Sequence, residues 1–174
     1  MTRRRLILIR HAKAEAGAVD LERPLTSRGV SDAAAAGLLL ARAGVVPDRA
    51  VLSPARRARQ TWDGVQAGLA EPVEAVIDER VYDNHVAALL QVIADVEVNV
   101  DAVVGCLVLV GHNPSFAELA ITLDDGQGDQ QARQRLRVGY PTSGVAIFEL
   151  TGGWDELAPE SATLLGFDIG RGAA

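Results

Sequence analysis

Short apolar runs of strand length alternate along this chain with longer stretches that carry a helical period. The strand-length runs lie at residues 5–9, 50–52, 73–77, 107–110, 145–150 and 162–167. The helical patterns lie at residues 31–43, 54–69, 85–96, 114–123 and 130–136. Continuous apolar runs are typical of parallel strands that are buried on both faces. The alternation predicts an α/β fold, a three-layer α/β/α sandwich with a mostly parallel central sheet.

Residues that mark helix ends occur beside several of these patterns. We expect Gly44 to end the helix that starts at Ser31, because glycine readily adopts the backbone conformation that follows a helix. Ser53 is predicted to cap the second helix, with Pro54 as its first residue. Asn84 is predicted to cap the third helix in the same way.

Length, composition and charge narrow the class of protein. A chain of 174 residues can build its own core, and we expect residues 1–174 to form a single domain. The net charge of −6 argues against a nucleic-acid binder, which is normally basic. No apolar run approaches the roughly 20 residues of a membrane-spanning helix, so we predict a cytoplasmic protein without a membrane partner. The single cysteine, Cys106, excludes an internal disulfide, and we interpret it as a small buried hydrophobe.

Polar residues follow three of the predicted strands. These are Arg10-His11, Ser53-Pro54 and His112-Asn113. Ligands bind outside the carboxyl ends of parallel strands, and right-handed crossovers bring these three ends to one edge of the sheet. Arg57 lies one turn into the second helix, within reach of that edge. The helices expected to open at Ser53 and Asn113 would add free N–H groups, so the sequence predicts an anion site here.

A histidine beside an arginine at a strand end is a candidate covalent nucleophile for phosphate. Phosphoryl transfer depends mainly on positioning and on stabilising charge on the equatorial oxygens. Arginine forks match phosphate geometry and stay protonated. A covalent intermediate on His11 would split one difficult displacement into two easier steps. His11 must be neutral to attack, so we expect a backbone carbonyl or similar acceptor to fix its tautomer, while His112 is expected as a protonated donor.

Five segments, in the same order along the chain, resemble the motifs of the histidine phosphatase (phosphoglycerate-mutase-like) superfamily. They are residues 8–15 (LIRHAKAE), 23–29 (RPLTSRG), 53–61 (SPARRARQT), 110–114 (VGHNP) and 141–144 (PTSG). The matches span most of the chain. The short chain and the RPLT form resemble the branch typified by the phosphohistidine phosphatase SixA.

The resemblance implies a phosphoglycerate-mutase-like fold and a metal-independent phosphatase with no cofactor. It implies that His11 takes the phosphoryl group, and that Arg10, Arg57 and His112 complete the catalytic set by surrounding the phosphate oxygens. The three histidines do not form a recognisable metal set. The substrate implied by this branch is phosphohistidine on a protein. Nothing in the sequence indicates the oligomeric state.

Two further residues are candidates for substrate binding. Asn113 follows the second histidine directly. Arg23 fits two interpretations equally, one in which it lines the site and one in which it anchors its loop. The spacing from Ser53 selects Arg57 among its neighbours, so we expect Arg56 and Arg59 to lie on the surface.

No residue is clearly marked as a general acid. Asp83 and Glu15 are both candidates, and both equally fit surface carboxylates or caps. The SixA-like branch manages without a strong acid, because a phosphoramidate has a better leaving group than an alkyl phosphomonoester. This favours phosphohistidine or another activated phosphate over sugar phosphates.

Two alternatives stay open. The same catalytic core would serve a phosphatase of a small phosphomonoester or a nucleoside phosphate. A catalytically silent module that binds phosphorylated partners is an alternative of another class, against which the intact set of arginines and histidines argues.

Overall fold

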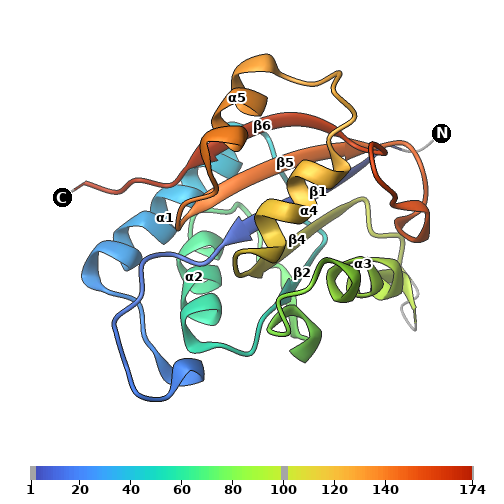
Figure 1. The fold of residues 1–174 in the computed structure, drawn as a ribbon. Helices are drawn as coiled ribbons and strands as arrows, with labels where there is room; N and C mark the ends of the chain where they lie inside the picture. Colours follow the sequence, from blue (N-terminus) through green and yellow to red (C-terminus); the bar gives the residue numbers. More distant parts are fainter. Residues whose placement is uncertain (1–2, 99–101, 174) are drawn as a thin grey trace.

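Figure 1 shows the computed structural model, which describes residues 3–98 and 102–173. Within these residues, six strands form a sheet in the order β3-β2-β4-β1-β5-β6. The strands are β1 (Arg4–Arg10), β2 (Arg49–Leu52), β3 (Glu74–Ile77), β4 (Cys106–Gly111), β5 (Gly144–Leu150) and β6 (Thr163–Ile169). Strand β5 pairs antiparallel with both of its neighbours, and the remaining strands run in one direction. The prediction of a mostly parallel sheet is confirmed.

Helices cover both faces of this sheet. The helices α1 (Ser27–Arg42) and α2 (Arg56–Gln66) pack on one face, and α3 (Val86–Ala94), α4 (Ser115–Leu123) and α5 (Gln130–Val138) pack on the other. Short 3-10 helices occur in the connections, at η1 (Asp20–Glu22), η2 (Glu79–Val81), η3 (Asp95–Glu97) and η4 (Trp154–Glu156). The predicted three-layer α/β/α sandwich is therefore confirmed.

The unbroken apolar run of β1 follows from burial on both faces. Leu6 and Leu8 belong to the core under α3, α4 and α5, whereas Ile7 and Ile9 belong to the core under α1 and α2. Cys106 in the neighbouring β4 lies in the second of these cores, and burial raises the pKa of its thiol to about 12. Its interpretation as a small buried hydrophobe is confirmed.

The first two helices begin at other residues than predicted. Helix α1 starts four residues before Ser31, because the hydroxyl of Thr26 accepts a hydrogen bond from the Gly29 amide at 2.9 Å and caps it there. Helix α2 starts at Arg56, so Ser53 does not cap it. The buried Ser53 side chain is instead used inside the site described below.

The prediction that Asn84 caps the third helix is also wrong. His85 precedes α3, and Asn84 adopts a left-handed backbone conformation with φ of 60°. Its side chain reaches across to the start of α4, where it donates to the Asn113 carbonyl at 2.7 Å and accepts from the Ser115 amide at 3.1 Å. Asn84 therefore links two loops at the same edge of the sheet.

That edge collects the carboxyl ends of β1, β2 and β4, because these strands are parallel. The antiparallel β5 begins at the same edge, so residues 141–143 also arrive there. The Ser143 amide lies 3.2 Å from the carbonyl oxygens of both Arg10 and His11 and joins this loop to the end of β1. Among the described residues, none of the helices has the length and apolar character needed to span a bilayer.

Candidate active site

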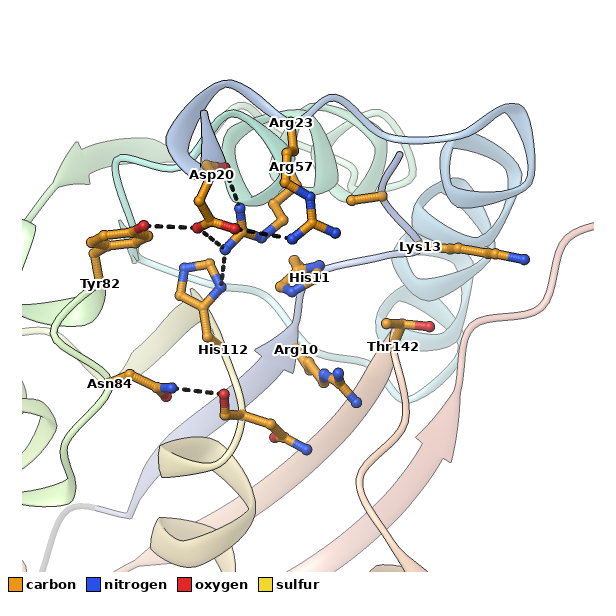
Figure 2. A pocket seen from close by; sticks show the side chains of 12 residues that line it. Arg10, His11, Lys13, Asp20, Arg23, Arg57, Tyr82, Asn84, His112 and Thr142 are labelled. Carbon is orange, nitrogen blue, oxygen red and sulfur yellow. Dashed lines mark hydrogen bonds and ion pairs between the residues drawn. The ribbon is translucent and has the colours of Figure 1, made fainter. Parts of the chain in front are cut away.

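A pocket of about 480 Å³ opens at the carboxyl edge of the sheet (Figure 2). It contains all six residues that the sequence analysis selected. The lining consists of Arg10, His11, Lys13, Ala14, Asp20, Arg23, Arg57, Tyr82, Asn84, His112, Asn113 and Thr142. Segments that are more than 100 residues apart in sequence thus meet around one cavity.

His11 is held as a neutral ring with one free nitrogen. Its Nδ1 lies 2.8 Å from the carbonyl oxygen of Ala12, which can only accept, so Nδ1 carries the proton. Burial, together with the charges of Arg57 and Arg10, lowers the pKa of His11 to about 4, although the bond to Ala12 opposes this. The expected backbone acceptor is therefore present. Nε2 keeps its lone pair, as a nucleophile requires.

Arg10 is fixed at one end and has an unused donor at the other. Its Nη1 donates to the carbonyl oxygen of Tyr140 at 2.8 Å, and Asn113 Nδ2 donates to the same oxygen at 2.8 Å. The Nε of Arg10 is buried without a partner in the described part of the chain. A buried donor without an acceptor is costly, so this nitrogen is suited to an anionic ligand.

Arg57 is the buried member of its arginine cluster, whereas Arg56 and Arg59 are exposed, as predicted. Its Nη1 donates to the backbone oxygen of Asp20 at 2.7 Å, and its Nη2 donates to Asp20 Oδ2 at 2.9 Å. The same Nη2 lies 3.4 Å from His112 Nδ1. Its Nε is buried and, within residues 3–98 and 102–173, has no partner. Arg57 thus joins the second histidine to the β1–α1 loop.

His112 is also neutral in this arrangement. Its Nδ1 faces a guanidinium, which can only donate, so the proton lies on Nε2 and is donated to Ser53 Oγ at 2.7 Å. Burial, repulsion from the His11 ring once that ring is protonated, and the charge of Arg57 lower the pKa of His112 to about 3. The interpretation of His112 as a protonated donor, made from the sequence, is therefore wrong for this arrangement. The rings of His11 and His112 lie 5.1 Å apart between centroids.

Arg23 both lines the site and anchors its loop, the two interpretations that the sequence left open. It lines the pocket, and it also holds its own loop through a bond from Nε to the Glu15 carbonyl at 2.8 Å and a bond from Nη1 to Asp20 Oδ1 at 2.9 Å. Its side chain is about one-third exposed, so it lies at the rim of the pocket.

Sequence reasoning missed Asp20, the acidic member of the described lining. Its Oδ2 accepts from Arg57 and, at 2.7 Å, from the Tyr82 hydroxyl, while Oδ1 accepts from Arg23. Led by the bond from Tyr82, these contacts hold the pKa of the Asp20 carboxyl far below its usual range. No motif marks Asp20, and the only local signal is the arginine three residues later.

The two acids proposed from the sequence lie elsewhere. Glu15 and Asp83 are exposed, and neither lines the pocket. The amides at the start of α4 do not face the pocket as free donors either, because those of Ser115 and Phe116 donate to Asn84 and to the His112 carbonyl. No group of three or more His, Cys, Asp or Glu side chains in the described residues could hold a metal ion.

The charges of the lining favour an anion despite the net charge of the chain. The described lining has four cationic side chains, Arg10, Lys13, Arg23 and Arg57, and a single carboxylate, Asp20. Buried guanidinium donors in such a pocket can stabilise the oxygens of a tetrahedral anion next to a neutral, unpaired imidazole nitrogen. The arrangement therefore suits phosphoryl transfer to a histidine.

Comparisons with known proteins agree with this chemistry. The family model for the histidine phosphatase superfamily (branch 1) matches residues 6–89. An uncharacterized protein of Mycobacterium tuberculosis is 34% identical over 166 residues, which cover 94% of this chain and 100% of that protein. A structure assigned as phosphohistidine phosphatase SixA from Nakamurella multipartitia is 29% identical, with a TM-score of 0.82 over 100% of this chain and 99% of the other. One assigned as SixA from Agrobacterium tumefaciens is 27% identical, with a TM-score of 0.76 over 95% and 97%.

Proposed function

Because the chain belongs to the histidine phosphatase superfamily, in its SixA-type branch, we propose that this phosphatase hydrolyses phosphohistidine on a protein. The phosphoryl group passes first to His11 and then to water, without a metal ion. Both steps use the same pocket, and each exchanges one bond to phosphorus for another.

In the first step, the lone pair of His11 Nε2 attacks phosphorus. The P–N bond of the substrate breaks, and its electron pair returns to the departing ring nitrogen. Arg10 and Arg57 stabilise charge on the equatorial oxygens with their unpaired Nε donors. The bound dianion also favours a protonated His112, whose Nδ1 then becomes a donor.

In the second step, water attacks the phosphorus bound to His11. The P–N bond breaks, its electrons return to Nε2, and phosphate leaves with the oxygen and both protons of the water. Nδ1 keeps its proton throughout, because the carbonyl of Ala12 holds it. Asn113 and Arg23 line the same pocket, where they bind the substrate without taking part in proton transfer.

The choice of phosphohistidine as substrate is supported by the lack of a proton-donating acid in the described lining of the pocket. Asp20 is the acidic residue of the described lining, and its partners hold it ionised, so it has no proton to give to a leaving alkoxide. A neutral imidazole is a better leaving group than an alkoxide. The site is therefore matched to a phosphoramidate rather than to an alkyl phosphate ester.

The test is to incubate the enzyme with a labelled phosphohistidine protein in the presence of a chelator, and to quench the reaction within one turnover. We expect an acid-labile, base-stable phosphoenzyme in the unaltered protein and none in His11→Ala. His85→Ala is the matched control, since His85 is exposed and outside the pocket. An enzyme that turns over its substrate without any label would contradict the covalent mechanism.

Steady-state comparison of substrates decides between the alternatives. Turnover of a phosphohistidine protein should exceed that of a panel of alkyl phosphate esters and nucleoside phosphates. The reverse order would favour a small-molecule phosphatase with the same core. Tight phosphate binding without turnover of any substrate would favour a silent phosphate-binding module.

A further inference from the structure

Asp20 is an unexpected residue in a pocket built for an anion. Its carboxylate lies beside the guanidinium groups that would hold the phosphoryl group, and about half of its side chain is exposed at the pocket mouth. Figure 2 shows it extending from the β1–α1 loop, next to Tyr82 and above His112. A fixed negative charge at this place weakens the binding of any phosphate. It therefore needs a reason in the chemistry of the substrate.

Holding Arg57 is only part of that reason. The backbone oxygen of Asp20 already accepts from Arg57 Nη1, at 2.7 Å, without any carboxylate. The carboxylate adds a bond to Arg57 Nη2 and also gathers Tyr82 and Arg23. Two of its three donors bond Oδ2, and Oδ1 accepts only from Arg23 among the described residues. Since a carboxylate accepts about four hydrogen bonds, Oδ1 can take one more.

We propose that Asp20 determines specificity for phosphoimidazole substrates: its carboxylate accepts a hydrogen bond from the ring N–H far from phosphorus and keeps that ring protonated. This inference rests on the proposed function. With that N–H in place, cleavage of the P–N bond returns the electron pair to the near nitrogen, and neutral imidazole departs. Without it, the leaving group is an imidazolide anion, which departs far more slowly.

The charges around Asp20 explain why a carboxylate is needed for this task. Arg23 faces it from the same loop and Arg57 from α2, while Tyr82 faces it from the residue after η2 and His112 from the end of β4. The two arginines repel a cationic ring and favour its deprotonation. The Asp20 carboxylate offsets their charge. The carboxylate thus keeps the leaving group neutral through its charge, whereas an alkyl phosphate needs an acid that donates a proton to the leaving oxygen.

The test compares kcat against pH for phosphoimidazole and for p-nitrophenyl phosphate, whose leaving group has no ring nitrogen. With Asp20→Asn, the alkaline fall of kcat for phosphoimidazole should move about one pH unit lower, because the charge that favours ring protonation is lost. The ratio of the two kcat values at pH 8 should then fall about tenfold. Asp20→Glu should restore much of this ratio of kcat values. Asp83 is an exposed carboxylate outside the pocket, so Asp83→Asn should leave the ratio unchanged.

Activity on p-nitrophenyl phosphate reports whether each variant is folded and still transfers phosphate. If Asp20→Asn lowers both activities equally, or shifts neither profile, Asp20 only positions Arg57 and the inference is overturned, while the proposed function stands. If the unaltered enzyme hydrolyses the aryl ester but not phosphoimidazole or a phosphohistidine protein, the proposed function itself fails. Should Asp20→Asn be unstable, Asp20→Ser removes the same charge with a smaller side chain.

Discussion

Lowering the pH from 8 to 5 should destabilise this protein through His11 and His112. Both rings are buried and neutral, with pKa values lowered from 6.5 to about 4 and about 3. In the unfolded chain they return to the ordinary value, so below pH 6.5 the unfolded state binds more protons than the folded state. The stability contributed by the neutral rings is therefore complete above pH 6.5 and is lost as the pH falls.

The size of the loss follows from these pKa values. At pH 5 an unfolded histidine is almost fully protonated and each folded one is almost fully neutral, so each contributes a loss of about 2 kcal/mol relative to pH 8. The two together give a loss of about 4 kcal/mol, a large part of the stability of an ordinary domain. The depressed pKa of Asp20 adds its own loss mainly below pH 5, because an unfolded aspartate is largely ionised above that value.

Urea unfolding in a phosphate-free buffer measures this slope, with free energies of unfolding taken at pH 8, 7, 6 and 5. His112→Gln should lose about 2 kcal/mol less between pH 8 and 5 than the unaltered protein, because one titrating ring is gone. His11→Asn should behave in the same way. His85→Gln, at an exposed residue outside the pocket, is the matched control substitution. A variant at His112 with the slope of the unaltered protein would refute the neutral, buried state of that ring.

Three further substitutions test other parts of the structure. Arg57→Ala should lower kcat by about 10²- to 10³-fold, as expected for a lost oxyanion donor. Arg56 is exposed, so Arg56→Ala should keep a kcat close to that of the unaltered enzyme. Equal losses of kcat in steady-state assays would show that the wrong arginine was chosen. Ser53→Ala should cost about 1–3 kcal/mol in urea unfolding, since it leaves a buried histidine N–H without an acceptor, and an unchanged midpoint would argue against that bond. Gly29→Ala would place a Cβ 2.1 Å from a backbone oxygen and should destabilise the fold by about 1–3 kcal/mol in thermal unfolding. A Cβ at Gly166 would meet nothing within 4 Å, so Gly166→Ala should not show a loss of stability from such a clash.

The sheet and the central site residues were predictable because they depend on local sequence and on general topology. A strand buried on both faces requires a continuous apolar run, and parallel strands must end at one edge. His11 and His112 follow such strands directly, so the sheet alone brings them together. The family motifs then selected Arg57 from three nearby arginines, and its burial agrees with that choice.

Helix starts were predicted less well, because polar side chains have competing partners. Ser53 and Asn84 are both good capping residues by type. In the folded chain, Ser53 bonds His112 and Asn84 bonds the start of α4, at distances in sequence that no local pattern reveals. Both side chains therefore form hydrogen bonds at the carboxyl edge of the sheet and do not cap the helix that follows them.

The sequence by itself determined the order of strands and helices, the edge where ligand-binding groups gather and the expectation of a neutral His11 there. Only the tertiary structure decided the charge state of the pocket. Asp20 is the first residue of the short 3-10 helix η1 in the β1–α1 connection, and it enters the site because Arg57, Arg23 and Tyr82 converge on its carboxylate. Such convergence depends on three-dimensional distances between segments, and a linear pattern carries no information about them.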